Sequence, residues 1–126
     1  MGIPPDRERA VHHHQADPFM QACIEHCSAC HAVCLQTITH CLARGGVHAA
    51  PGHIALLATC ADLCRVSADA MLRGSDAHEA ICLACADVCR RCADDCERLG
   101  DDDPAMQHCV QACRRCAESC AAMASA

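Results

Sequence analysis

The feature that most constrains the fold is the twelve-residue stretch CADVCRRCADDC at residues 85–96. Its four cysteines are spaced 4, 3 and 4 residues apart, so a helix would place them all on one face. The same frame, C-x3-C-x2-C-x3-C, recurs at residues 23–34 and 109–120. An incomplete copy spans residues 60–71, where Ser67 and Met71 replace the last two cysteines. This spacing is typical of core positions in packed helices, so the repeat predicts one helix per copy.

Turn-forming residues separate the four copies. Breaks fall at RGGVHAAPG, around Gly74 and around Gly100, and no strand pattern is found between them. We expect helices near residues 18–43, 52–73, 76–99 and 104–124. Linkers this short favour antiparallel neighbours. The predicted fold is therefore all-α: an antiparallel up-down-up-down four-helix bundle with a cysteine-lined core.

Helix-start signals agree with these boundaries. The Asp-Pro pairs at 17–18 and 103–104 match an N-cap followed by proline at the first helical position. Asp76 and Glu79 have the spacing of a capping box. The bundle domain is expected to span residues 18–126, and residues 1–17 to form an N-terminal arm or a short extra helix.

Composition rules out an ordinary hydrophobic core. The chain has 126 residues, of which 16 are cysteine and a single phenylalanine is aromatic. Such cysteine usage indicates a disulfide scaffold or a metal site. The N-terminus carries charges and histidines and lacks the apolar run of a secretory signal, and no apolar segment is long enough to span a membrane. We therefore expect a cytoplasmic protein with reduced thiols, in which clustered cysteines point to metal or redox chemistry.

Partners and catalysis are constrained as well. The formal net charge is −6, which argues against nucleic acid as a partner. No strand–loop framework, phosphate-binding loop or acid/base pair stands out, so we do not expect an enzyme. Leu35 and Leu42 lie on one outer helix face and Leu83 on another, which suggests contacts between subunits.

Several uses of the cysteines compete. Buried cysteine can replace alanine as a small hydrophobe. Disulfides between helices are feasible and would make the chain a stapled helical interaction module, although i, i+4 side chains about 5–6 Å apart do not suit bridges within a helix. Zinc or iron–sulfur binding would use C-x3-C and C-x2-C pairs, yet a few such sites would not account for a continuous line of cysteines.

Cu(I) fits the pattern best. Soft thiolate and thioether ligands select Cu(I), which accepts two or three ligands, so capacity would be on the order of one ion per cysteine, roughly 16. One Cu(I) per thiolate also leaves the buried core near neutral. Without metal the thiols stay protonated, so loading releases about one proton per cysteine. The predicted ligands are Cys23, Cys27, Cys30, Cys34, Cys41, Cys60, Cys64, Cys82, Cys85, Cys89, Cys92, Cys96, Cys109, Cys113, Cys116 and Cys120.

With its C-x3-C motifs on every predicted helix, the chain resembles the bacterial copper storage proteins from about Met20 to Met123. The missing signal peptide makes it similar to the cytosolic members. The resemblance implies storage of many Cu(I) ions along the bundle axis, a homotetramer, and a cytosolic copper chaperone as a possible donor. It implies ions held by the pairs Cys23/Cys27, Cys30/Cys34, Cys60/Cys64, Cys85/Cys89, Cys92/Cys96, Cys109/Cys113 and Cys116/Cys120. The single pair on the second helix departs from the pattern.

Two ends of the bundle are candidates for the entrance. The lines of core positions finish at one end with Cys41, His53, Leu99 and Met106, and at the other with Met20, Met71, His78 and Met123. In the family, His and Met residues near the end of the first helix and the start of the fourth line the entrance. The resemblance therefore favours His53, Met106 and His108 as entrance ligands. Alternatively, His108 is solvated, since it falls one residue off the line, and the methionines are core residues.

Overall fold

The structure is a computed structural model that describes residues 17–100 and 102–125. Within these ranges the chain forms α2 (Pro18–Arg44), the 3-10 helix η1 (Gly46–Ala49), α3 (Pro51–Leu72), α4 (His78–Gly100) and α5 (Pro104–Ser125). Each long helix begins and ends within about two residues of its predicted bounds. The predicted N-terminal arm or extra helix lies outside the described residues.

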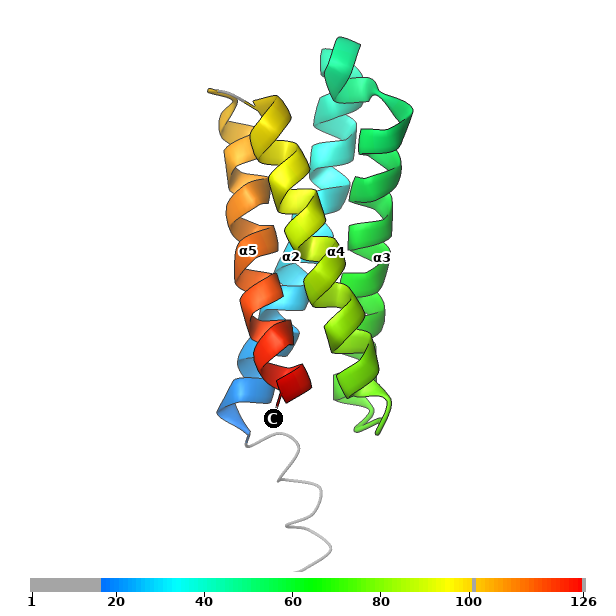
Figure 1. The fold of residues 1–126 in the computed structure, drawn as a ribbon, viewed down its shortest axis with the longest axis vertical. Coiled ribbons are helices and arrows are strands. Elements are labelled where there is room, and N and C mark those ends of the chain that lie inside the picture. Colours follow the sequence, from blue (N-terminus) through cyan, green and yellow to red (C-terminus); the bar gives the residue numbers. More distant parts are fainter. Residues whose placement is uncertain (1–16, 101, 126) are drawn as a thin grey trace, which may run out of the picture.

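The long helices form an antiparallel bundle (Figure 1). The neighbouring pairs are α2 with α3, α3 with α4, α4 with α5, and α5 with α2, so the helices close a ring around one axis. The predicted four-helix bundle is thus confirmed. The α2–α3 and α4–α5 connections lie at one end, and the α3–α4 connection lies at the other, where α2 begins and α5 ends (Figure 1).

Aspartate caps start two of the helices, as predicted. The Asp17 carboxylate accepts hydrogen bonds from the backbone N–H groups of Phe19 and Met20 at 3.0 and 3.2 Å. The Asp103 carboxylate accepts the N–H of Ala105 at 3.0 Å. These bonds satisfy donors that the first helical turn leaves unpaired.

The start of α4 differs from the prediction. The helix begins at His78, two residues later than expected, and the turn before it is held by Ser75 rather than by a capping box of Asp76 and Glu79. The Ser75 hydroxyl accepts the backbone N–H of Ala77 at 3.1 Å. The serine hydroxyl thus satisfies the N–H of Ala77, whereas a capping box would have satisfied those of Asp76 and Glu79.

The core contains sulfur and small side chains. Every cysteine is at most 1% exposed, and alanines such as Ala61, Ala86 and Ala93 are fully buried beside them. Phe19, the aromatic residue, is 78% exposed. Small flanking residues let the helices approach closely, which brings the thiols of different helices into mutual contact. No described helix has both the length and the apolar character needed to cross a bilayer.

Candidate metal centre

The sixteen cysteines line the bundle axis within one buried cluster, which we call the thiol core. All lie within the described residues, and all are free thiols. Contacts between helices link α2 to α5 and α3 to α4 at sulfur–sulfur distances of 3.5 to 3.9 Å. A disulfide has a sulfur–sulfur distance of about 2.05 Å, so these are contacts between separate thiols.

The C-x3-C pairs place two sulfurs one helical turn apart. Their Sγ atoms are separated by 3.9 Å in Cys30/Cys34, 3.8 Å in Cys85/Cys89 and 4.0 Å in Cys109/Cys113. An ion midway between two thiolates needs a separation of about twice a metal–sulfur bond, or ~4.6 Å if the zinc–thiolate length of ~2.3 Å is taken as a guide. Small rotations about the cysteine χ1 angles would therefore let a pair hold one ion.

Cysteines of different helices also form groups of four whose sulfurs all lie within 4.8 Å of one another. These groups share members: Cys30 belongs to two of them, and so do Cys64 and Cys89. Isolated tetrahedral zinc sites do not share ligands in this way. Shared sulfurs suit thiolates that bridge several soft ions.

Burial favours the neutral form of two of the thiols, Cys41 and Cys82. The pKa of Cys41 is raised to about 11, chiefly by burial and then by the nearby Cys109 and Asp103. Hydrogen bonding with Cys120 and burial raise the pKa of Cys82 to about 11. A metal ion must therefore displace a proton from either of these two thiols when it binds there.

The α3 side of the core is interrupted by an oxygen. Ser67 is fully buried, and its Oγ lies 3.3 Å from Cys82 Sγ, 3.7 Å from Cys27 Sγ and 3.8 Å from Cys120 Sγ. A hydroxyl is a harder and weaker ligand for Cu(I) than a thiolate. The incomplete sequence repeat therefore appears in space as a local gap in the sulfur lining.

At the opposite end of the core, three helices bring together a mixed ligand set that we call the mouth cluster: Cys41, His53 and Met106. Cys41 Sγ lies 3.5 Å from His53 Nε2 and 3.5 Å from Met106 Sδ. His53 is only 4% exposed. Sulfur and imidazole donors at this spacing can hold a soft cation.

Asp95 orients the histidine of the mouth cluster. His53 Nδ1 lies 2.7 Å from Asp95 Oδ2, and Arg98 bonds the other carboxylate oxygen. Burial alone would raise the pKa of Asp95, but the bonds from His53 and Arg98 outweigh it, so the pKa lies below its ordinary value. An ionised carboxylate only accepts, so Nδ1 carries the proton and Nε2 offers its lone pair toward Cys41. Sequence reasoning missed Asp95, since nothing in the cysteine frame marks it.

A second carboxylate ties α2 to the start of α5. Asp103 Oδ2 accepts hydrogen bonds from His40 Nε2 and Arg44 Nη1, both at 2.7 Å. The hydrogen bond and charge of His40, the N–H of Ala105 and the hydrogen bond from Arg44 outweigh burial and lower the pKa of Asp103 to about 2. His40, adjacent to the predicted entrance in sequence, therefore holds the helix ends together.

The remaining residues that were predicted at the two ends of the core do not join the mouth cluster. Met71 and Met123 are buried, whereas the half-buried His78 bonds the backbone oxygen of Ser75 through Nδ1 at 2.8 Å. His108 is exposed on α5 and forms no hydrogen bond with the mouth cluster among the described residues, so its role as a ligand stays a prediction.

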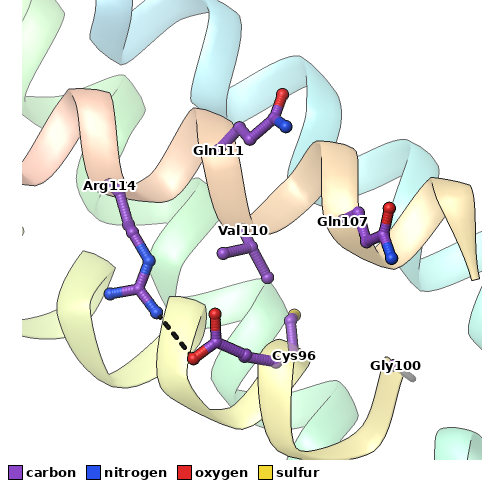
Figure 2. Close-up of a pocket in the computed structure, with 7 residues that line it drawn as sticks. Cys96, Gly100, Gln107, Val110, Gln111 and Arg114 are labelled. Atoms are coloured by element: carbon purple, nitrogen blue, oxygen red, sulfur yellow. Dashed lines mark ion pairs between the residues drawn. The ribbon is translucent and has the colours of Figure 1, made fainter. Parts of the chain in front are cut away.

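A surface hollow of about 480 Å³ lies between α4 and α5 (Figure 2). Cys96 lines it together with Gly100, Gln107 and Val110, yet the cysteine itself is 0% exposed. Arg114 of α5 forms an ion pair with Glu97 of α4 at 3.2 Å across this hollow (Figure 2). The pair braces the two helices on the outer side of the thiol core.

Fold and core together define a helical bundle built to bind soft metal ions. The family model of the copper storage proteins matches residues 16–125, and the chain belongs to this family. The resemblance inferred from the cysteine motifs is confirmed.

Solved structures agree. A protein from Nitrosospira multiformis is 42% identical, with a TM-score of 0.82 over 87% of this chain and 98% of that one. The Cu(I)-bound copper storage protein BsCsp3 is 38% identical, with a TM-score of 0.78 over 84% and 98%. A cytosolic copper storage protein from Streptomyces lividans, with five coppers, is 32% identical, with a TM-score of 0.79 over 86% and 93%.

A curated relative matches over a shorter stretch. The cysteine-rich protein YhjQ of Bacillus subtilis is 37% identical over 71 residues, which cover 56% of this chain and 66% of that protein. The match thus spans just under two thirds of that relative's length.

Proposed function

We propose that this chain stores Cu(I), taking up on the order of one ion per cysteine, roughly 16. The observation that carries the proposal is the sharing of sulfurs between neighbouring four-cysteine groups. Bridging thiolates allow the number of ions to approach the number of sulfurs, whereas separate four-ligand sites would hold about a quarter as many. Relatives bound to Cu(I), including one loaded with ten copper equivalents, support the choice of metal.

Uptake would proceed by ligand exchange. Cu(I) first meets the mouth cluster, where His53 Nε2 and Met106 Sδ offer neutral donors that need not lose a proton. Cys41 then exchanges its proton for the ion. Deeper in the core, beyond the mouth cluster, cysteine sulfurs 3.5 to 4.0 Å apart let the ion gain one thiolate before it leaves another. Each step stays within the two or three ligands that Cu(I) accepts.

The expected setting of the protein is part of the same proposal. The Streptomyces lividans relative is described as cytosolic, which supports a cytoplasmic store supplied by a copper chaperone. Leu35, Leu42 and Leu83 are exposed on outer faces, and Leu83 is 63% exposed. These apolar side chains support assembly into a homotetramer. The ion-binding groups are buried thiols, which suits storage rather than catalysis.

An anaerobic Cu(I) titration against a competing chelator tests the proposal. We expect uptake of roughly 16 ions per chain, release of about one proton per cysteine, and nearly unchanged helicity. Saturation at one to four ions would contradict it. Thiol titration of the anaerobically purified protein separates storage from the disulfide-stapled alternative, for which few free thiols would be found.

A further inference from the structure

The two connections at the mouth end of the bundle (Figure 1) border a hollow of about 400 Å³. The α2–α3 connection contributes His48 of η1, which packs against both α2 and α3. The α4–α5 connection contributes Asp102 and Asp103. Among the described residues, no cysteine or methionine lines this hollow. Its chemistry therefore differs from that of the thiol core and of the mouth cluster.

His48 has an unusual environment for an imidazole. The residue is 7% exposed, and the described part of the chain supplies no hydrogen-bond partner for its buried Nε2. Leaving a buried polar atom without a partner destabilises a fold. A leucine at this position would avoid that cost, so the unpaired nitrogen suggests a ligand in the hollow that His48 lines.

Asp102 adds a carboxylate to the same hollow. Its side chain is exposed and has no hydrogen-bond or ion-pair partner among the described residues. The neighbouring Asp103 is different, because its carboxylate already accepts bonds from His40, Arg44 and the N–H of Ala105. Asp102 is therefore the carboxylate that is available to an ion in the hollow.

The charges around the hollow favour a cation. Arg44 is the positively charged residue among the described residues of its lining, and the guanidinium donates to Asp103 Oδ2 at 2.7 Å. With His48 neutral, the two carboxylates and one guanidinium leave a net charge of −1. α2 ends at Arg44 and α4 ends at Gly100, so the partial negative charge of two helix C-termini adds to this field.

We propose that His48 Nε2 and the Asp102 carboxylate form a binding site for a divalent cation of the Zn(II) type, which fastens η1 to the α4–α5 connection. Imidazole nitrogen and carboxylate oxygen are ordinary Zn(II) ligands, with bonds of about 2.0–2.2 Å. Cu(I) is not the expected ion, since a carboxylate is a hard ligand and no sulfur from the described residues lines the hollow. The site shares no residue with the thiol core or the mouth cluster, so it does not depend on the storage of Cu(I).

Zn(II) titration of the full-length protein tests the site. The protein is first saturated anaerobically with Cu(I), which occupies thiols that would otherwise bind Zn(II). All proteins also carry His12→Ala, His13→Ala and His14→Ala, because a run of histidines can bind Zn(II) on its own.

Three substitutions are compared in this background by calorimetry. His48→Leu removes the nitrogen ligand and should bind one Zn(II) fewer per chain than the background protein. Asp102→Asn should weaken binding at that site at least roughly tenfold. His78→Leu, at the opposite end of the bundle, is the matched control and should bind like the background protein. Equal Zn(II) binding in the background protein and His48→Leu, or unchanged affinity in Asp102→Asn, would overturn the proposal.

A second measurement does not depend on the variants folding. Long-range 1H–15N spectra follow the imidazole nitrogens of the wild-type protein as Zn(II) is added. A shift of the His48 Nε2 signal that is reversed by a chelator of divalent ions supports the site. An unchanged His48 signal contradicts it.

Discussion

The two ends of the bundle use the same cysteine frame but differ in what surrounds it. At the mouth end, nitrogen and thioether donors meet Cys41 within 3.5 Å, and Asp95 fixes the orientation of His53. At the far end, Met71 and Met123 close the core with apolar bulk, and Ser67 interrupts the sulfur lining. We therefore expect the frame to specify what is stored, and residues outside the frame to decide which end exchanges ions.

The largest expected effect comes from removing the ligands of one end at a time. Replacing the whole mouth cluster should slow Cu(I) loading at least roughly tenfold. The imidazole and thioether of this cluster can bind an ion without first losing a proton, and the variant lacks both. The variant is Cys41→Ser, His53→Leu, Met106→Leu. Replacing Met20, Met71 and Met123 by leucine keeps the core volume and should leave the rate near that of the wild type. Stopped-flow transfer from a Cu(I)–chelator complex measures both. Slower loading in the far-end variant would reverse the assignment of the ends.

A close helix approach at the mouth end should be sensitive to one methyl group. Gly100→Ala would place a Cβ 2.6 Å from Met106 Cβ, and we expect the free energy of unfolding of the empty protein to fall by about 1–3 kcal/mol. Gly52, also helical, has nothing within 4 Å of an added Cβ, so Gly52→Ala should be neutral or stabilise by up to about 1 kcal/mol. Urea unfolding compares the two. Equal stability of both variants would show that α4 and Met106 can move apart freely.

Acid should loosen the mouth end through Asp103. Its pKa in the folded protein is about 2, below the ordinary value of 3.8. The ionised carboxylate therefore stabilises the fold above about pH 4, and this contribution is lost as the pH falls toward 2. Wild type should be more stable than Asp103→Asn near neutral pH, and the difference should shrink in acid. Denaturant midpoints of the empty protein at several pH values measure this, with the exposed Asp76→Asn as control. A constant difference across this range would contradict the expectation.

The smallest expected effect is a change of about one ion at the interruption in α3. Ser67→Cys would place a thiol among Cys27, Cys82 and Cys120, which the serine oxygen contacts at 3.3 to 3.8 Å. Capacity should rise by about one ion, since each bridging sulfur accounts for about one. Ser67→Ala, which adds no donor, should leave capacity unchanged. Anaerobic titration to saturation distinguishes them, and a gain in both variants would mean that Ser67 does not limit loading.

Much of this architecture could be predicted from the sequence because it follows from periodicity. The 4-3-4 spacing places cysteines in the core whatever the other details of packing, and the Asp-Pro pairs mark helix starts. His53 and Met106 could be predicted too, since they continue the same spacing beyond the cysteines. Their burial and contacts with Cys41 agree with that expectation.

What could not be predicted depends on contacts between helices. Asp95 precedes a core cysteine and looks like any surface acid until α3 brings His53 against it. Asp103 looks like a simple cap until the end of α2 supplies His40 and Arg44. The burial of His48 depends on how η1 folds onto α2 and α3. Partners that lie far apart in sequence leave no periodic signal.

The even number of long helices in the described part of the chain has a practical consequence. Because α2 begins and α5 ends at the far end (Figure 1), a tether or fluorescent fusion joined after α5 would lie about one helix length from the mouth cluster. Chains anchored in this way on an electrode or bead would all present the same end to solution. The direction of the peptide chain thus provides a built-in handle for reading copper exchange in an oriented layer.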